Sequence, residues 1–410
     1  MMMVGLVILL SLATKLQAQM YQVVDLGTLG GDSSAAYGIN NNGQVVGLAY
    51  TTNNTTGHAF LYSNKTMQDL GTLGGNSSIA YAINDKGGIA GQASTDSDSI
   101  GHAFLYVNDS MQDLGTFGGT VSRAAAINAN NDVAGSAYFY YFYNNAFAHA
   151  FLYSDGTLRN LGTLNSQFYF FSDGYGINNN GQVVGSTSIN SGPMHAFQYS
   201  NGVMQDIGTL GGYSSSAYGI NDNGQIVGNA DTTDGSTHAF LYMSGLMRDL
   251  GTLNGSSCAL SININGQIVG YSYINGNTEH AFLYVNDSMQ DLNNLIPTNS
   301  GWILTQATAI NNAGQIVGSG INSNGQYHAY LLNPLNLLPF TLSVTTNRFQ
   351  GLPVFQLIGP AGFNYQLQAS TNLINWDNTL ILTNINGTVP FVDLDSTNFN
   401  QRFYRVVAPF

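Results

Sequence analysis

The stretch "HAFLYSNKTMQDLGTLGG", from His58 to Gly75, decides the fold because the chain repeats it. The 410 residues contain seven His, and every one of them opens a copy of this phrase. A repeat of this length indicates one supersecondary unit built several times. The copies begin at intervals of 42 to 48 residues, at His58, His102, His149, His195, His238, His280 and, in the shortened form "HAYLLNP", at His328.

Each unit also carries a phrase of the form "INxxGQ", which predicts a first hairpin. In "AYGINNNGQVVG", the pair Asn42-Gly43 is expected to form a two-residue type I′ turn, which requires two residues with positive φ. Such a turn pairs Gly38 with Gly47 and places Tyr37 on a face of large side chains that packs into the hollow face of the next sheet. The copies are headed by Ile39, Ile83, Ile127, Ile177, Ile220, Ile262 and Ile310.

The "HAFLYSNKTMQDLG" phrase predicts a second hairpin, with its turn at Asn64-Lys65. This turn pairs Phe60 with Asp69 and His58 with Gly71. Two hairpins give four strands per unit, which is the size of a propeller blade. The sequence therefore predicts an all-β fold, with a seven-bladed β-propeller over residues 19–333.

A solenoid is the alternative for such a repeat, but the ends of the repeat region favour a ring. The region opens with a single strand of the outer type at residues 21–27, and its last unit stops after the third strand, "HAYLLNP". We expect residues 21–27 to complete the last blade, with Asp25 opposite Tyr330. A solenoid would instead need distinct polar caps.

The phrases "AINxxGQIVG", "HAFLY" and "MQDLGTLGG" resemble the bacterial extracellular HAF-repeat family over roughly residues 21–333. The resemblance implies secretion and a repeated β architecture, and it supplies no established reaction or ligand. Three positions depart from the pattern: Asn160 replaces the Asp of "DLG", Asn293 replaces its Gly, and Tyr330 replaces the Phe of "HAF".

The two ends of the chain lie outside the repeat. Residues 1–18, "MMMVGLVILLSLATKLQA", have a short apolar core and predict a signal peptide, too short to span a bilayer. The predicted location is therefore secreted, either extracellular or at the cell surface. After a linker at residues 334–340, short alternating runs over residues 341–410 predict a small β-sandwich. This module resembles one found at the C-terminus of other secreted bacterial proteins.

The composition excludes several partners. Nine Lys and Arg against 22 Asp and Glu give a formal net charge of −13, which argues against nucleic acid and against an anionic membrane surface. Beyond residues 1–18 no stretch is long and apolar enough for a membrane span. The single cysteine, Cys258, excludes an internal disulfide framework, and we expect it to be buried and inert on an inner strand.

The histidines are predicted to be structural. One His on the third strand of each blade leaves them too far apart to share a zinc ion. Each can instead bond the "DLG" aspartate of its own blade, such as Asp69 for His58. The aspartates are separated in the same way, so they cannot form a catalytic pair.

No cofactor is predicted, with calcium as the alternative. Two acidic loops carry the carboxylates that calcium prefers, one with Asp96 and Asp98 and the other with Asp231 and Asp234. The ion needs six to eight oxygen ligands. Solvated polar turns explain the same residues without an ion.

Two aromatic loops form the predicted binding site. The stretches "YFYYFYNNAFA" and "QFYFF" fall where propeller loops are normally polar, and both connections leave the same face of blades 3 and 4. Exposed aromatic rings suit a sugar or an apolar partner surface, and the alternative is that the rings pack on each other in an extended hairpin. The predicted ligand-binding residues are Tyr138, Tyr140, Tyr141, Tyr143, Phe168, Tyr169 and Phe171.

These observations predict a secreted, monomeric, non-enzymatic propeller that binds a glycan or an extracellular protein. Two alternatives stay open: a polysaccharide hydrolase or lyase with its site in the axial channel, and a purely structural surface protein. An enzyme needs two or more carboxylates or histidines at the channel mouth. A binding protein needs an exposed aromatic or acidic patch, and a structural protein has neither.

Overall fold

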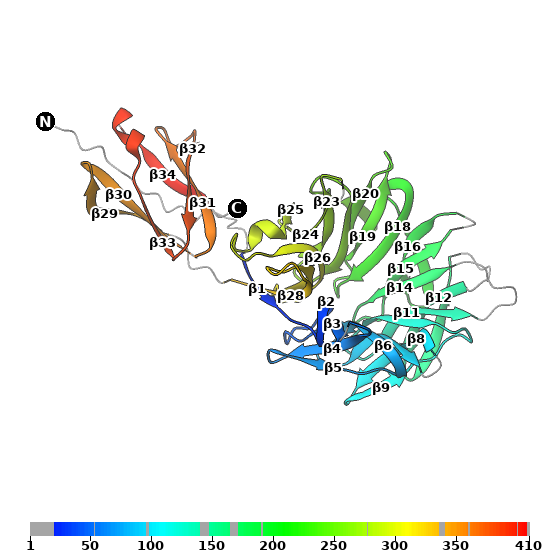
Figure 1. The fold of residues 1–410 in the computed structure, drawn as a ribbon. Helices are drawn as coiled ribbons and strands as arrows, with labels where there is room; N and C mark the ends of the chain where they lie inside the picture. Colours follow the sequence, from blue (N-terminus) through cyan, green and yellow to red (C-terminus); the bar gives the residue numbers. More distant parts are fainter. Residues whose placement is uncertain are drawn as a thin grey trace. The chain divides into compact units, whose positions relative to one another are not determined.

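The computed structural model describes residues 20–52, 54–95, 98–139, 147–164, 171–189, 192–276, 278–335, 341–359, 361–399 and 401–407. The predicted signal peptide lies outside these ranges. No helix among the described residues has the length and apolarity that a bilayer crossing requires. The described strands form seven four-stranded and two three-stranded sheets (Figure 1). They divide into a repeat body, Val24–Asn293 with Trp302–Leu332, and a C-terminal body that holds the other described residues.

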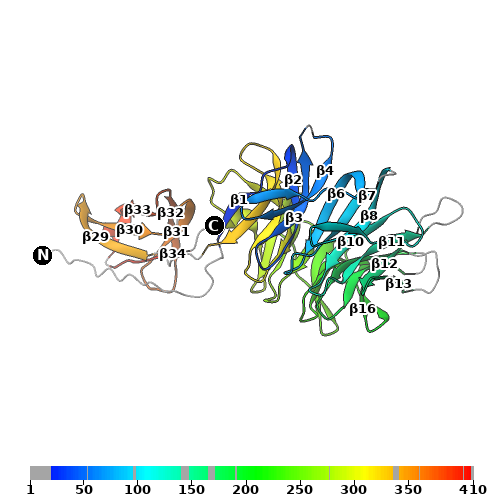
Figure 2. The same cartoon turned by 90° about the horizontal axis from the view of Figure 1, so that it is seen from below.

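The seven four-stranded antiparallel sheets lie in the repeat body, apart from the first residues of β1 and the last of β28, in a propeller-like arrangement. In Figure 1, β2, β14 and β26 lie toward the middle of this body and β5, β9 and β20 toward its rim. Figure 2 shows the sheets that contain β2–β4, β6–β8 and β10–β13 one after another. The innermost strands are β2 (Gly30–Ile39), β6 (Gly74–Ile83), β10 (Ser122–Ile127), β14 (Ser172–Ile177), β18 (Gly211–Ile220), β22 (Ser257–Ile262) and β26 (Ile303–Ile310). The second strands are β3 (Val45–Thr51), β7 (Ile89–Thr95), β11 (Val133–Phe139), β15 (Val183–Ser188), β19 (Ile226–Thr232), β23 (Ile268–Ile274) and β27 (Ile316–Ile321). The third strands are β4 (Gly57–Ser63), β8 (Asp98–Val107), β12 (Phe147–Ser154), β16 (Met194–Ser200), β20 (Thr237–Met243), β24 (Thr278–Val285) and β28 (Tyr327–Pro334). The outermost strands are β5 (Thr66–Asp69), β9 (Ser110–Asp113), β13 (Thr157–Gly162), β17 (Val203–Gly208), β21 (Leu246–Asp249), β25 (Ser288–Asp291) and β1 (Tyr21–Asp25), and the 3-10 turn η1 (Leu292–Leu295) follows β25.

The outermost strand of the last sheet comes from the start of the chain. The strand order in this sheet is β1-β28-β27-β26. Leu26 N donates to Ala329 O at 3.0 Å, and Asp25 Oδ1 lies 2.8 Å from His328 Nδ1. The outermost strands of the other sheets make equivalent bonds within their own sheets, so β1 occupies the position of a fourth strand.

The hairpin between the third and outermost strands follows the sequence prediction. Asn64 has a φ of 52° and Lys65 a φ of 64°. Both values are positive, as a type I′ turn requires. The predicted pair of Phe60 with Asp69 is confirmed. The five equivalent turns also have two positive-φ residues each. The same type of turn therefore fixes the register at the tip of six outer hairpins.

The predicted pairing of His58 with Gly71 is wrong. In the third sheet the equivalent glycine, Gly162, pairs with Ala150, one residue beyond the histidine. The register shifts because Leu161 is an extra residue on the outermost strand, a β-bulge that directs its side chain into the hydrophobic core.

The inner hairpin also departs from its predicted register. Ala36, and not Gly38, pairs with Gly47, while Gly38 pairs with Val46. Tyr37 is the residue left over, so a β-bulge interrupts the innermost strand. The same shift occurs at the same place in all seven innermost strands.

The inner turn has three loop residues rather than two. Asn40 N donates to Gln44 O at 3.0 Å, Gly43 N donates to Asn40 O at 3.1 Å, and of the loop residues only Gly43 has positive φ, 75°. Asn42, which the type I′ prediction required to be left-handed, does not have positive φ. The side chain of Asn40 completes the loop, because its Oδ1 accepts from the backbone N of Asn42 and of Gln44.

The same asparagine joins neighbouring sheets. Asn40 Nδ2 donates to the backbone O of Asn84, its equivalent in the next sheet, at 3.0 Å. The pattern continues around the repeat body at 2.8–3.3 Å, and Asn311 of the last sheet donates to Asn40 O of the first. The seven donors are Asn40, Asn84, Asn128, Asn178, Asn221, Asn263 and Asn311.

Serine hydroxyls form a second set of bonds between sheets. Ser78 Oγ on β6 accepts from Ala59 N of the preceding sheet at 2.8 Å and donates to Gly71 O. Six of the seven junctions have such a serine. At the junction of the sixth and seventh sheets Leu304 replaces the serine, and Asn293 bonds both N and O of Leu304 instead, at 2.8 and 3.0 Å. This contact explains why Asn293 stands where other repeats have glycine.

The core of the repeat body lies between neighbouring sheets. The Phe of each "HAF" phrase is fully buried, as is Tyr330, its replacement in the last sheet. Gly47 must stay small, because a Cβ there would lie 2.8 Å from the Phe60 ring and 2.0 Å from a backbone oxygen. One hydrophobic cluster joins the last sheet to the first, through Leu331 and Leu26 on one side and Phe60 on the other.

The C-terminal body contains two three-stranded sheets. Their orders are β29-β30-β33 and β32-β31-β34. Phe355 of β30 packs on Tyr404 of β34 with ring centroids 4.7 Å apart, so the two sheets face each other across an aromatic core. The elements are β29 (Thr341–Phe349), β30 (Leu352–Ile358), β31 (Phe363–Ser370), β32 (Asp377–Asn384), β33 (Thr388–Phe391), the 3-10 turn η2 (Leu394–Asn398) and β34 (Phe403–Val407).

Candidate functional site

The seven histidines bond within their own sheets, as predicted. His58 Nδ1 lies 2.8 Å from Asp69 Oδ2, and Asp69 Oδ1 accepts from Gly71 N at 2.8 Å. In the third sheet Asn160 takes the place of the aspartate, 3.1 Å from its histidine. Among the described residues no group of three or more His, Cys, Asp or Glu side chains is placed to hold a metal ion.

The structure describes the acidic side chains of only one of the two predicted calcium loops. Asp96 lies outside the described residues, and the side chain of Asp98 does too. Asp231 Oδ1 accepts from Thr237 Oγ1 at 2.8 Å, and Asp234 accepts bonds within its own turn. Asp234 therefore serves the turn that carries it, and Asp231 also accepts from Ser214 N of β18 at 3.1 Å.

Cys258 lies on the innermost strand β22 and is buried, as the sequence predicts. Burial raises the pKa of its thiol to about 12. The thiol therefore stays protonated at neutral pH and is a poor nucleophile.

Only part of the predicted aromatic site lies within the described residues. Tyr138 is on β11 and pairs with Ala148. Phe171 stands just before β14, 40% exposed, with its ring centroid 5.4 Å from that of Phe147. The predicted residues that lie outside the described ranges are Tyr140, Tyr141, Tyr143, Phe168 and Tyr169.

Three aromatic residues beside this site, Phe117, Phe139 and Phe147, were not among the predicted residues. Phe139 stacks on Phe117 at 4.9 Å and meets the His149 ring edge-on, also at 4.9 Å. Phe139 pairs with Phe147 across β11 and β12, and Phe117, Phe139, Phe147 and Phe171 form what we call the aromatic strip. Its rings come from the ends of β11 and β12 and from the connections that precede β10 and β14. The strip is partly packed on itself, and it exposes Phe171.

A separate pocket lies where the seven innermost strands meet. Its volume is about 500 Å³, and it is lined from β2, β6, β10, β14, β18, β22 and β26. The bulge described above supplies its side chains, because the extra residue of each strand is directed into the pocket. The seven bulged residues are Tyr37, Tyr81, Ala125, Tyr175, Tyr218, Leu260 and Thr308. The predicted packing of Tyr37 into the hollow of the next sheet is therefore wrong.

Five planar groups line this axial pocket in sequence. The ring centroids of Tyr37 and Tyr81 are 5.6 Å apart, and those of Tyr175 and Tyr218 are 5.2 Å apart. The guanidinium of Arg123 lies between the two pairs, 4.8 Å from the Tyr81 ring and 5.7 Å from the Tyr175 ring. It occupies the gap that the small bulged residue of the third sheet leaves.

Arg123 supplies the charge of the axial pocket. Burial raises the pKa of Tyr37 to about 12 and also raises those of Tyr81, Tyr175 and Tyr218, so these hydroxyls are neutral at physiological pH. Arg123 acts in the opposite direction on the pKa of all four tyrosines, because it favours their anionic forms. Of the described residues that line the pocket, none is a carboxylate or a histidine.

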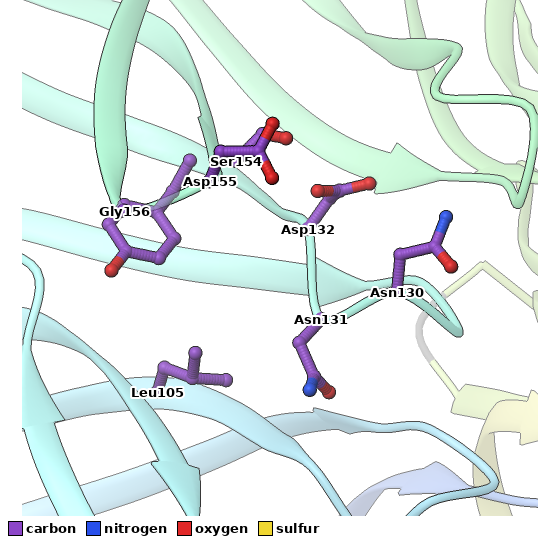
Figure 3. Close-up of a pocket in the computed structure, with 8 residues that line it drawn as sticks. Leu105, Asn130, Asn131, Asp132, Ser154, Asp155 and Gly156 are labelled. Atoms are coloured by element: carbon purple, nitrogen blue, oxygen red, sulfur yellow. The ribbon is translucent and has the colours of Figure 1, made fainter.

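A second hollow, of about 470 Å³, lies at the turns of the third sheet (Figure 3). It is lined by Leu105 of the second sheet, by residues 130–132 and by residues 153–156. Its polar groups are largely engaged, since Asn131 Oδ1 and Asp132 Oδ2 accept bonds from the asparagines that join the sheets. We assign it no site.

A signal for the axial pocket is present in the sequence. Four of the seven inner phrases have tyrosine two residues before the isoleucine, as in "AYGIN" and "AYAIN". Period-two alternation places such a tyrosine on the same face as that isoleucine. Only the bulge, which depends on packing between the sheets, directs it to the pocket.

Comparison with known proteins gives a likeness of fold. No family model matches the chain, and no curated protein matches it. TolB from Acinetobacter baumannii is similar at 14% identity and a TM-score of 0.39, over 72% of this chain and 80% of TolB. A puromycin-hydrolyzing peptidase from Mycobacterium tuberculosis is similar at 10% identity and a TM-score of 0.49, over 84% of this chain and 61% of the peptidase. The extracellular domain of a hybrid two-component system from B. thetaiotaomicron is similar at 14% identity and a TM-score of 0.42, over 92% of this chain and 51% of that one.

At these identities and TM-scores, the likenesses carry no argument about function. The chain spans about 60% of the peptidase and about half of the extracellular domain.

Proposed function

We propose that this chain is a secreted, non-enzymatic, seven-bladed β-propeller, closed by β1, that binds a glycan or a protein outside the cell. The asparagine bonds that run from each sheet to the next, and from the last sheet to the first, support a closed ring of seven blades. The signal-peptide pattern and the resemblance to the HAF-repeat family support secretion.

The aromatic strip is the observation that carries the binding function. Phe171 is 40% exposed beside Phe147, in a body that buries the Phe of every "HAF" phrase. Exposed rings next to one another provide a flat apolar surface for a sugar ring or for an apolar side chain of a partner. The tyrosine-rich residues 140–143 follow directly in the chain from Phe139 of the strip.

The axial pocket supports a binding function over the hydrolase alternative. A glycoside hydrolase acting there needs a pair of carboxylates. The described lining residues of the pocket provide tyrosines and one arginine instead.

A glycan array with matched variants tests the proposal. We expect the purified chain to bind particular glycans, and the double variant Phe147→Ala, Phe171→Ala to lose that binding with an unchanged melting temperature. Leu246→Ala, which removes an exposed apolar side chain from the start of β21 in the fifth sheet, is the control and should bind as the parent does. An array without any bound glycan would remove the glycan from the proposal. Unchanged binding by the double variant would remove the strip as the site.

A further inference from the structure

We propose that the axial pocket binds a small carboxylate carried on a ring, with the Arg123 guanidinium as the anion contact. This inference goes beyond the proposed function, because it concerns a different site from the aromatic strip. Either site can exist without the other.

The guanidinium of Arg123 has no acceptor among the described residues. Its contacts there are the two tyrosine faces of Tyr81 and Tyr175. Of the five other arginines, Arg248 and Arg402 have carboxylate partners, at 2.8 Å from Asp287 and 2.9 Å from Asp393. An arginine in a protein is always charged and carries five N–H donors, so Arg123 has donors free for a ligand.

The two tyrosine rings hold the guanidinium ready for a planar anion. A guanidinium stacked on aromatic faces keeps its N–H groups at its edges, and two of these edge groups match the two oxygens of a carboxylate. Because the rings restrict the side chain in advance, little further freedom is lost when the anion binds.

The rest of the pocket suits the ring of such a ligand. The pocket volume is about 500 Å³. This size is typical of small-molecule sites in proteins. Tyr37 and Tyr218 offer further aromatic surface against which a ring can pack. No carboxylate in the described lining competes with the ligand. Asp173, on the neighbouring strand β14, is close enough to raise the pKa of Tyr175 but does not line the pocket.

Two classes of compound share this chemistry: a hexuronic acid from an acidic glycan, and an aromatic carboxylate. Isothermal titration of the full chain with D-glucuronate and with benzoate separates them. D-glucose and benzamide are the neutral counterparts. Binding of either acid without its neutral counterpart supports the proposal and identifies the class.

Two charge-matched variants test the role of Arg123. Arg123→Gln should weaken the binding of the acid at least about tenfold, because a bidentate charge-assisted contact is lost. Arg159→Gln, which removes an exposed arginine from the outermost strand β13, should bind as the parent does. A thermal melt of each variant shows that it is folded. If Arg123→Gln does not fold, Arg123→Lys keeps the charge without the planar fork and should also weaken binding.

The proposal is overturned if the folded parent binds neither acid, or if it binds each acid no better than the neutral counterpart. It is also overturned if the folded Arg123 variant binds as tightly as the parent. Because Phe147 and Phe171 lie outside the lining of the axial pocket, their double variant should still bind the acid. That measurement separates failure of the strip from failure of the pocket.

Discussion

The two hairpins of each repeat have similar sequence patterns, but only the outer one adopts the predicted turn and register at its tip. In the outer hairpin, two left-handed residues close the turn and Phe60 pairs with Asp69 as predicted. In the inner hairpin, one left-handed residue closes a longer turn and the register shifts at Tyr37. The turn residues therefore determine the register of the outer hairpin, which few neighbouring elements contact. Packing between sheets determines the register of the inner hairpin, which neighbouring sheets enclose.

The enclosure of the inner hairpin has a geometric cause. Seven innermost strands meet around one pocket, and a bulge increases the local twist of each strand there. The extra residue is then directed away from its own sheet. The side chain of Asn40 satisfies the backbone of the longer turn and also bonds the next sheet, which links the local distortion to the assembly of the sheets.

Loss of the outermost strand β1 is expected to have the largest effect on the free energy of unfolding. Deleting residues 19–28 removes β1 with its buried Tyr21, and also the buried Leu26 that follows β1. Burial of one such side chain contributes about 1.5–3 kcal/mol, so we expect the loss of two to lower the free energy of unfolding by about 3–6 kcal/mol. Guanidinium denaturation should show a single, earlier transition for the whole repeat body. An unchanged melting temperature would contradict both the role of β1 and the proposed ring closure.

The stability of the protein should depend nearly as strongly on one side chain of the inner turn, that of Asn40. Asn40→Ala removes an acceptor of two backbone N–H groups and a donor to the next sheet. Buried groups left without partners cost about 1–3 kcal/mol each, so we expect a loss of roughly 3 kcal/mol in urea denaturation.

Asn40→Asp is the comparison variant: it keeps an acceptor oxygen for the turn but replaces the Nδ2 donor with a buried negative charge that faces Asn84 O. Its loss of stability should be larger at neutral pH than at acidic pH, where the carboxyl is protonated and can donate. An Asn40→Ala protein as stable as the parent would show that the inner turns do not hold the sheets together.

The outer hairpin should respond less to loss of its histidine. His58→Ala removes one side-chain bond and leaves a small void, for a loss of about 1–3 kcal/mol in chemical denaturation. Asp69→Asn should cost less, because the third sheet carries Asn160 in that position and still bonds its histidine. Stoichiometric zinc in the parent protein that disappears in His58→Ala would contradict the structural role.

The smallest effect is expected from two glycine variants, one in the outer turn and one in the inner turn, which compare the two turns directly. Lys65 has a φ of 64°, in the left-handed region. Lys65→Gly should raise the free energy of unfolding by about 0.5–1 kcal/mol, because glycine adopts such a φ without strain. Asn42→Gly should lower stability. The φ of Asn42 is not positive, so glycine relieves no strain there, and the change removes the bond that Asn42 Nδ2 donates to Asp85 O of the next sheet. Equal stabilisation by both changes would mean that the inner turn is of the two-residue type after all.

The sequence alone predicts much of what local chemistry governs. The positions of the four strands per repeat, the outer turns, the bond from His58 to Asp69 and the buried Cys258 follow from periodicity and from residues that accept positive φ. Each depends on residues a few positions apart in one sheet. For the candidate site, the sequence indicates Tyr138 and Phe171 but not Phe117, Phe139 and Phe147, which the fold brings together from the connection before β10 and from the ends of β11 and β12.

The sequence by itself determined the sevenfold repeat and the place of each strand within it, because hydrophobic alternation and turn residues act over short distances. The tertiary structure alone decided the bulge of the innermost strands and the axial pocket with its line of Tyr81, Arg123 and Tyr175. These features arise only when the innermost strands of several sheets compete for one space. Arg123 fills the gap at Ala125 because tyrosines of two other sheets stand on either side of it, and those neighbours are about 40 to 50 residues away in the chain.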